Sequence, residues 1–111
     1  MNYDEIVNNS MLPWLDLDIN IPHKEILQEA SDLIGGERNK DYGDKLKNHQ
    51  RIADLWSIFL EIKIEPEQVA IMMGLVKIAR IMHSSKKDNF VDLAAYASIA
   101  GEIVQRKGKN D

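Results

Sequence analysis

A run of fourteen residues, from Val69 to Met82, constrains the fold of this chain most, because almost every side chain in it is apolar or small. A helix that is apolar on nearly all sides is normally buried among other elements. Pro66 stands where a first helical residue is favoured, and Glu65 and Glu67 bring negative charge to the positive end of the helix dipole. The sequence therefore predicts a central, buried helix from Pro66 to about Met82.

Three further amphipathic helices are predicted from apolar residues that recur at helical spacing. Their expected ranges are 22–34, 45–61 and 90–106. Pro22 suits the first helical position, Gly35 and Gly36 end the first helix, and Asp88 is a candidate N-cap for the last one. The expected fold is all-α, a four-helix bundle-like single domain over residues 22–107 with a frayed tail at 108–111.

The first 21 residues differ from the rest. Between Trp14 and Ile21 apolar and mostly polar side chains alternate, a pattern typical of extended backbone. We expect an extended N-terminal arm over residues 1–21 that lies along the helices or pairs with a second copy. Small residues at helical spacing in the last helix, Ala94, Ala97, Ser98 and Gly101, allow either tight core packing or a close dimer contact. These features favour a homo-oligomer, a dimer or higher, over a monomer.

Composition excludes several classes of protein. With 14 basic and 18 acidic side chains the net charge is −4, and binding to DNA, which needs clustered Lys and Arg, is not expected. The absence of cysteine excludes disulfides, thiolate nucleophiles and Cys-type zinc sites. No positively charged leader and no apolar run of about 18 residues is present, so we expect no membrane span and a cytoplasmic location.

The most distinctive charged residues are Lys77 and Arg80, spaced i, i+3 within the apolar run. Buried cations need partners, and the next helix offers carboxylates at Asp88 and Asp92. Either an internal ion-pair network or a site for an anion or a metal would explain the pattern; a helix N-terminus there would favour phosphate. The candidate residues are Lys77, Arg80, Asp88, Asn89, Asp92 and Tyr96.

A second candidate group lies in the predicted loop at 35–44. Arg38 could hold a phosphate through its bidentate guanidinium, Tyr42 could stack on a base, and Asp41 adds a carboxylate. The alternative is a merely solvated loop. His49, at the start of the following helix, is a candidate ligand that is better explained as a surface histidine.

The chain resembles an uncharacterised family of small phage and prophage proteins over residues 37–102. The resemblance is carried, in order, by Arg38-x-x-Asp41-Tyr42-Gly43, Arg51-Ile-Ala-x-Leu-Trp56, Pro66-x-x-Val69-Ala-x-Met-Met73, Lys77-Ile-Ala-Arg80 and Asp88-Asn-x-x-Asp92-x-Ala-x-Tyr96-Ala. The last two motifs also look like phage nucleotide modification associated domains and, more remotely, all-α MazG-type nucleoside triphosphate pyrophosphatases. The resemblance implies an all-α, oligomeric, nucleotide-related protein, located in the host cytoplasm if a phage encodes it.

The chain departs from the pyrophosphatases at their metal-binding residues. Those enzymes hold Mg²⁺ with an ExxE and an ExxD pair, whereas the later pair here is Asn89-x-x-Asp92 and the earlier one could only be Glu29-x-x-Asp32. Fewer carboxylates make a weaker metal site. The resemblance therefore favours binding over hydrolysis.

Three functions stay open. The first is binding of a nucleotide or cyclic nucleotide by Arg38, Tyr42, Lys77 and Arg80, which in a phage would sequester a signal of host anti-phage defence. The second is a Mg²⁺-dependent nucleoside triphosphate pyrophosphohydrolase whose metal is held by Asp88 and Asp92, with Glu29 and Asp32. The third is a non-catalytic module that binds another protein through the N-terminal arm or a helical face.

Overall fold

The computed structural model describes residues 22–35 and 44–109, and these ranges fold into four helices. The helices are α2 (Pro22–Gly35), α4 (Lys45–Leu60), α5 (Pro66–His83) and α6 (Lys87–Lys109). The predicted all-α fold is confirmed, and the described ranges contain no strand. The predicted N-terminal arm lies outside them. No helix in the described part of the chain is long and apolar enough to cross a membrane.

The helix ends follow local chemistry. Both α2 and α5 begin at a proline, Pro22 and Pro66, whose fixed φ suits the first helical position. Asp44 caps α4, because its carboxylate accepts a hydrogen bond of 2.8 Å from the backbone N–H of Leu46. The same helix ends at Leu60, and its C-cap residue Glu61 has a φ of 59° in the left-handed region.

The last helix differs from its prediction at both ends. It begins at Lys87, so Asp88 lies in its first turn and the prediction that Asp88 is the N-cap is wrong. The turn starts earlier because the backbone N–H of Asn89 donates to the carbonyl of Lys86 at 3.1 Å. The helix continues to Lys109, past the predicted end at residue 106 and into the predicted tail.

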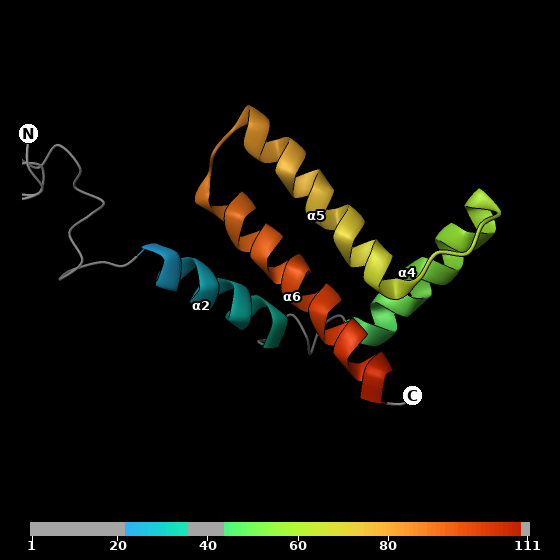
Figure 1. The fold of residues 1–111 in the computed structure, drawn as a ribbon. Helices are drawn as coiled ribbons and strands as arrows, with labels where there is room; N and C mark the ends of the chain where they lie inside the picture. Colours follow the sequence, from blue (N-terminus) through green and yellow to red (C-terminus); the bar gives the residue numbers. More distant parts are fainter. Residues whose placement is uncertain (1–21, 36–43, 110–111) are drawn as a thin grey trace, which may run out of the picture.

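The central helix is α6, which packs against α2 on one side and against α5 on the other (Figure 1). A short link over residues 84–86 joins α5 to α6, and the two helices form a hairpin. The remaining helix, α4, packs against α5 and, at its start, against α6, and its C-terminal end projects away from the other helices (Figure 1).

The core is divided among these contacts rather than concentrated in one place. Ala70 of α5 packs with residues of α6, Ala30 of α2 packs with others of α6, and Ala53 of α4 packs with Val69 of α5. Within residues 22–35 and 44–109, Val69 is the largest side chain that is fully buried. The buried apolar residues are Ala30, Ala53, Ile64, Val69, Ala70, Val91, Ala95, Ile99, Ala100 and Ile103.

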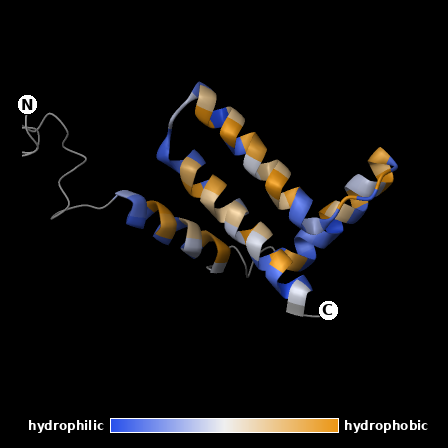
Figure 2. Cartoon of the chain, in the orientation of Figure 1, coloured by the Kyte–Doolittle hydropathy of each residue, from blue (hydrophilic) through white to orange (hydrophobic). Residues whose placement is uncertain are grey.

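The prediction that α5 is the central, buried helix is wrong. Its neighbours α6 and α4 cover only part of its circumference, and a row of large apolar side chains stays exposed. These are Ile71, Leu75, Ile78 and Met82, with 54%, 57%, 43% and 85% of their surfaces exposed. Hydrophobic residues extend along α5 and reach the outer end of α4 (Figure 2).

The small residues of α6 do not all serve core packing. Ala94 is half-buried and packs against the cluster that α2 shares with α6. Ala97, Ser98 and Gly101 are exposed, so the core-packing interpretation is wrong for these three. The alternative interpretation, a dimer contact on this face, stays a prediction.

Candidate functional site

Lys77 is the buried cation of the predicted charged group, with 9% of its surface exposed. Its Nζ lies 3.1 Å from Oδ2 of Asp92, so α6 supplies the carboxylate that a buried ammonium needs. This ion pair joins α5 to α6 in the half of the hairpin that is nearer the link. The structural interpretation therefore accounts for Lys77 and Asp92, and their predicted roles as ligands stay predictions.

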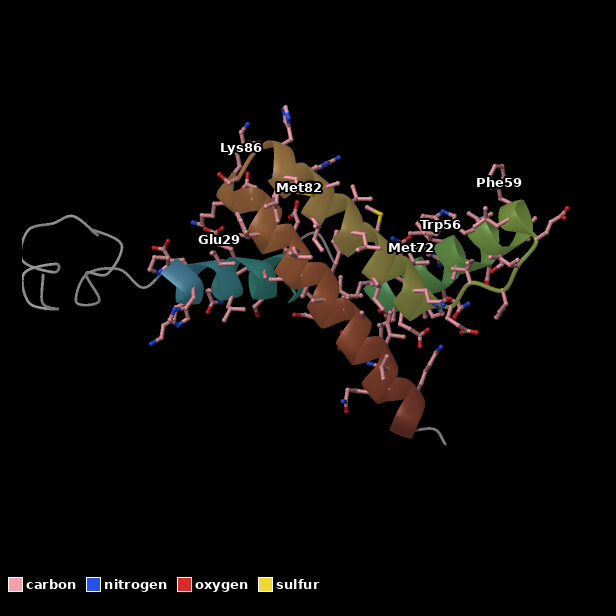
Figure 3. All side chains as sticks on the ribbon, turned by 45° about the horizontal axis from the view of Figure 1, so that its top comes forward. Glu29, Trp56, Phe59, Met72, Met82 and Lys86 are labelled. Carbon is pink, nitrogen blue, oxygen red and sulfur yellow. The ribbon has the colours of Figure 1, made fainter. Side chains whose placement is uncertain are left out.

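Arg80 points to a different environment, although it is only three residues further along α5. It is exposed and lines an open depression of about 510 Å³ where α5 meets the link to α6. The lining residues are Val76, Ala79, Arg80, His83, Ser84, Lys86 and Asn89. Lys86 stands on the link at the end of the hairpin, as Figure 3 shows.

The depression gathers donors suited to a phosphate. Arg80 offers a planar, bidentate guanidinium, Lys86 an ammonium, and His83 an imidazole that adds a positive charge when protonated. Among the ion pairs between described residues, none involves these three side chains. Asn89 donates from Nδ2 to the carbonyl of Ser84 at 3.2 Å, which fixes the link beneath them. The result is a local positive surface on an acidic protein.

Lys87 follows Lys86 directly, but two carboxylates of α2 neutralise its charge. Its Nζ lies 2.7 Å from Glu29 and 3.6 Å from Glu25. The hydrogen bond with Glu29 is the largest cause of a raised pKa for Lys87. Glu29, a predicted Mg²⁺ ligand, therefore holds α2 against the start of α6 (Figure 3).

The other predicted metal ligands do not gather with Glu29. Asp32 accepts a hydrogen bond of 2.9 Å from Gln28, and Asp92 is paired with Lys77. Asp88 is exposed in the first turn of α6. Within residues 22–35 and 44–109 no three His, Asp or Glu side chains are arranged to share a metal ion. The Mg²⁺ site stays a prediction without a supporting cluster.

His49 and Tyr96 belong to the packing of α4 on α6 and do not line the depression. His49 is buried, and its Nδ1 lies 2.7 Å from the carbonyl oxygen of Lys45, so the expectation of a surface histidine is wrong. Its ring lies 6.4 Å from that of Tyr96 in an edge-to-face arrangement. The physical reason is register, because His49 precedes the buried Ala53 by one helical turn.

The remaining predicted ligands, Arg38, Asp41 and Tyr42, lie outside the described residues. Sequence reasoning predicted only Arg80 and Asn89 among the residues that line the depression, and it missed the two other ionisable ones, His83 and Lys86. His83 follows Arg80 at i+3, and this spacing was the available signal. Lys86 is on the link, where helical spacing carries no information.

The chain belongs to the family described as a domain of unknown function, DUF6378, which its residues 25–104 match. It is 46% identical over 76 residues to the Gene 55 protein of Mycobacterium phage L5, a match that covers 67% of this chain and 49% of that protein. It is 43% identical over 83 residues to the Gene 55 protein of Mycobacterium phage D29, covering 74% and 55%. The chain thus spans about half the length of these relatives.

These matches confirm the predicted resemblance to an uncharacterised family of phage proteins. They do not extend to nucleotide modification domains or to MazG-type pyrophosphatases. No solved structure matches the chain.

Proposed function

We propose that this protein binds a phosphate-bearing nucleotide, and that the phosphate occupies the depression between the end of α5 and the start of α6. The observation that carries the proposal is the convergence of Arg80, His83 and Lys86 on one depression whose floor is fixed by Asn89. Cations and amide donors without internal partners are the groups that proteins use to hold phosphate.

Each lining residue has a distinct role in this proposal. The guanidinium of Arg80 binds two phosphate oxygens, and Lys86 contributes a positive charge at the rim. His83 donates a further hydrogen bond from the last turn of α5. Val76 and Ala79 supply an apolar wall against which a ribose or a base can lie. The predicted base-stacking residue Tyr42 and the second arginine, Arg38, lie outside the described residues, and the proposal does not depend on them.

The proposal departs from the sequence prediction at several residues: it adds His83 and Lys86, and it leaves out His49 and Tyr96 as well as Lys77 and Asp92. Lys77 and Asp92 hold the helices together and do not contact the ligand. Hydrolysis is not part of the proposal, because no described cluster of carboxylates supports a Mg²⁺ site. In a phage, the role that we propose for such binding is sequestration of a nucleotide signal of host anti-phage defence.

Isothermal titration calorimetry against a panel of nucleoside mono-, di- and triphosphates and cyclic nucleotides tests this proposal. The informative variant is Arg80→Gln combined with Lys86→Gln. The matched control is Lys47→Gln combined with Arg51→Gln, which removes the same charge from exposed positions of α4. Charge-assisted hydrogen bonds of this kind contribute about 1.5–3 kcal/mol each, so the first variant should bind at least about 10-fold more weakly.

Two results would refute nucleotide binding at this place. One is the absence of affinity for every nucleotide in the panel, and the other is an equal loss in both variants, which would indicate only a general charge effect. Release of phosphate or pyrophosphate in the presence of Mg²⁺ would show that the protein is a hydrolase and not only a nucleotide-binding protein. The same samples serve for that assay.

A further inference from the structure

The exposed apolar side chains of this protein are concentrated on two neighbouring helices. Of the thirteen large apolar residues that are exposed in the described ranges, ten lie in α4, in α5 or in the link between them. The two helices contact each other through Ala53 and Val69. Val76 belongs to the wall of the depression. Leu60 is turned about 160° away from Ile58 around α4. The α4–α5 face consists of the other eight: Leu55, Ile58, Phe59, Ile62, Ile71, Leu75, Ile78 and Met82.

The part of this face on α5 has the spacing of a helix–helix seam. Ile71, Leu75, Ile78 and Met82 follow one another at intervals of four, three and four residues. Such spacing is the heptad pattern that packs one helix lengthwise against another. No described element of the chain covers this row, because α6 and α4 contact other sides of α5.

The part on α4 continues the same apolar surface. Leu55 and Phe59 are one turn apart and exposed, and Phe59 stands near the free outer end of the helix (Figure 3). Met82 stands at the opposite end of the face, close to the link between α5 and α6 (Figure 3). The face therefore extends from one end of the helical body to the other.

The size of the face matches what a stable dimer buries. At roughly 150 Å² for a fully exposed large apolar side chain, the eight residues present on the order of 800 Å². The largest apolar patch on a typical monomer is about 300–600 Å². A standard interface removes about 800 Å² from each partner. The α4–α5 face is thus too large for an ordinary free surface and large enough for a whole interface.

We infer that the α4–α5 face is the interface of a homodimer, in which the seam of α5 packs antiparallel against the same seam of a second copy. A second copy is the occupant that the face itself supplies, because a two-fold interface joins identical patches and needs no other partner. Burial of the face also gives the chain the core that its small internal clusters lack. This inference does not rest on nucleotide binding.

Sedimentation velocity of the full chain, from about 1 to 100 µM, tests the inference. The expected result is a species of twice the chain mass of 12.7 kDa. Leu75→Glu should raise the dissociation constant by at least about 100-fold, because each copy then brings a charge into an apolar contact. Leu27→Glu is the matched control: Leu27 on α2 is 59% exposed, Leu75 is 57% exposed, and the control should stay dimeric.

Cross-linking gives a readout that does not depend on how well Leu75→Glu folds. The chain has no cysteine, so one introduced thiol is the sole thiol present. In an antiparallel pair the middle of the seam meets itself, and Leu75→Cys or Ile78→Cys should form an intermolecular disulfide under mild oxidation. Leu27→Cys should not. A monomer at 100 µM, or cross-linking no faster at the seam than at residue 27, would overturn the inference.

Discussion

The ion pair between Lys77 and Asp92 gives the sharpest test of how this fold is held together. Asp92→Asn keeps the shape of the side chain and removes the charge that faces the Lys77 ammonium at 3.1 Å. The lysine is left buried opposite a neutral amide. The pair is proposed to be structural, so the change should lower stability and leave the nucleotide site intact.

The expected cost follows from the burial of the two partners. Removing one member of a fully buried pair costs about 3–5 kcal/mol. The Asp92 side chain keeps 30% of its surface exposed, and water can partly replace the lost charge. We therefore expect a loss of about 2–3 kcal/mol, equivalent to a Tm lower by roughly 10–15 °C. The double variant Lys77→Met with Asp92→Leu removes both charges and should lie within about 1 kcal/mol of the wild type.

Urea unfolding followed by far-UV circular dichroism, at one fixed protein concentration, measures these differences. Asp54→Asn is the control, since Asp54 is an exposed carboxylate of α4 and its loss should cost less than about 0.5 kcal/mol. An equally small loss for Asp92→Asn would refute the structural role of the pair. A large loss of nucleotide affinity in a folded Asp92→Asn protein would return Asp92 to the ligand set.

Two further predictions follow from single contacts. Glu61 has a φ of 59°, which glycine adopts without strain because it has no Cβ. Glu61→Gly should therefore stabilise the protein by about 0.5–1 kcal/mol in thermal unfolding, whereas Glu61→Ala should give no gain. Equal effects of the two changes would contradict this explanation. Lys107 hydrogen-bonds Glu67 and Glu65, which raises the pKa of Lys107, and the same contact is the largest cause of a lowered pKa for Glu65. The stability that comes from the lowered pKa of Glu65 is fully present above the unfolded value of about 4.3, and it is lost as pH falls through the lowered pKa. The stability that comes from the raised pKa of Lys107 is fully present below the unfolded value of about 10.4, and it is lost as pH rises through the raised pKa. The stability difference between wild type and Lys107→Met should therefore be constant near neutrality and shrink at both extremes, and a difference independent of pH would refute this account.

The helix boundaries could be predicted where the backbone chemistry is local. Pro22 and Pro66 start helices because their φ is fixed, and α4 ends within one residue of its prediction. The start of α6 was missed because Asp88 is a good N-cap residue in isolation. The actual start depends on the hydrogen bonds that Asn89 makes to the link, and these need the folded hairpin.

The candidate site could be predicted only in part, for a geometric reason. Spacing of i, i+3 places Lys77 and Arg80 on roughly one side of α5, but the two positions still differ by about 60° around the helix. That rotation directs Lys77 towards α6 and Arg80 towards the depression at the end of the hairpin. His83 and Lys86 join Arg80 through the position of the link. A helical pattern alone does not predict where the link places these two side chains.

The exposed seam of α5 shows why an apolar pattern predicts burial without naming what does the burying. Every side of the run from Val69 to Met82 is apolar, so the four-three-four row of the seam is hidden among equally apolar neighbours. Inside one chain α6 and α4 can cover only part of such a helix, because each contacts a single sector of it. A helix that is apolar all round and only partly covered by its own chain therefore needs another molecule to bury the rest of its surface. On α5 the uncovered residues have the heptad spacing with which one helix packs against another.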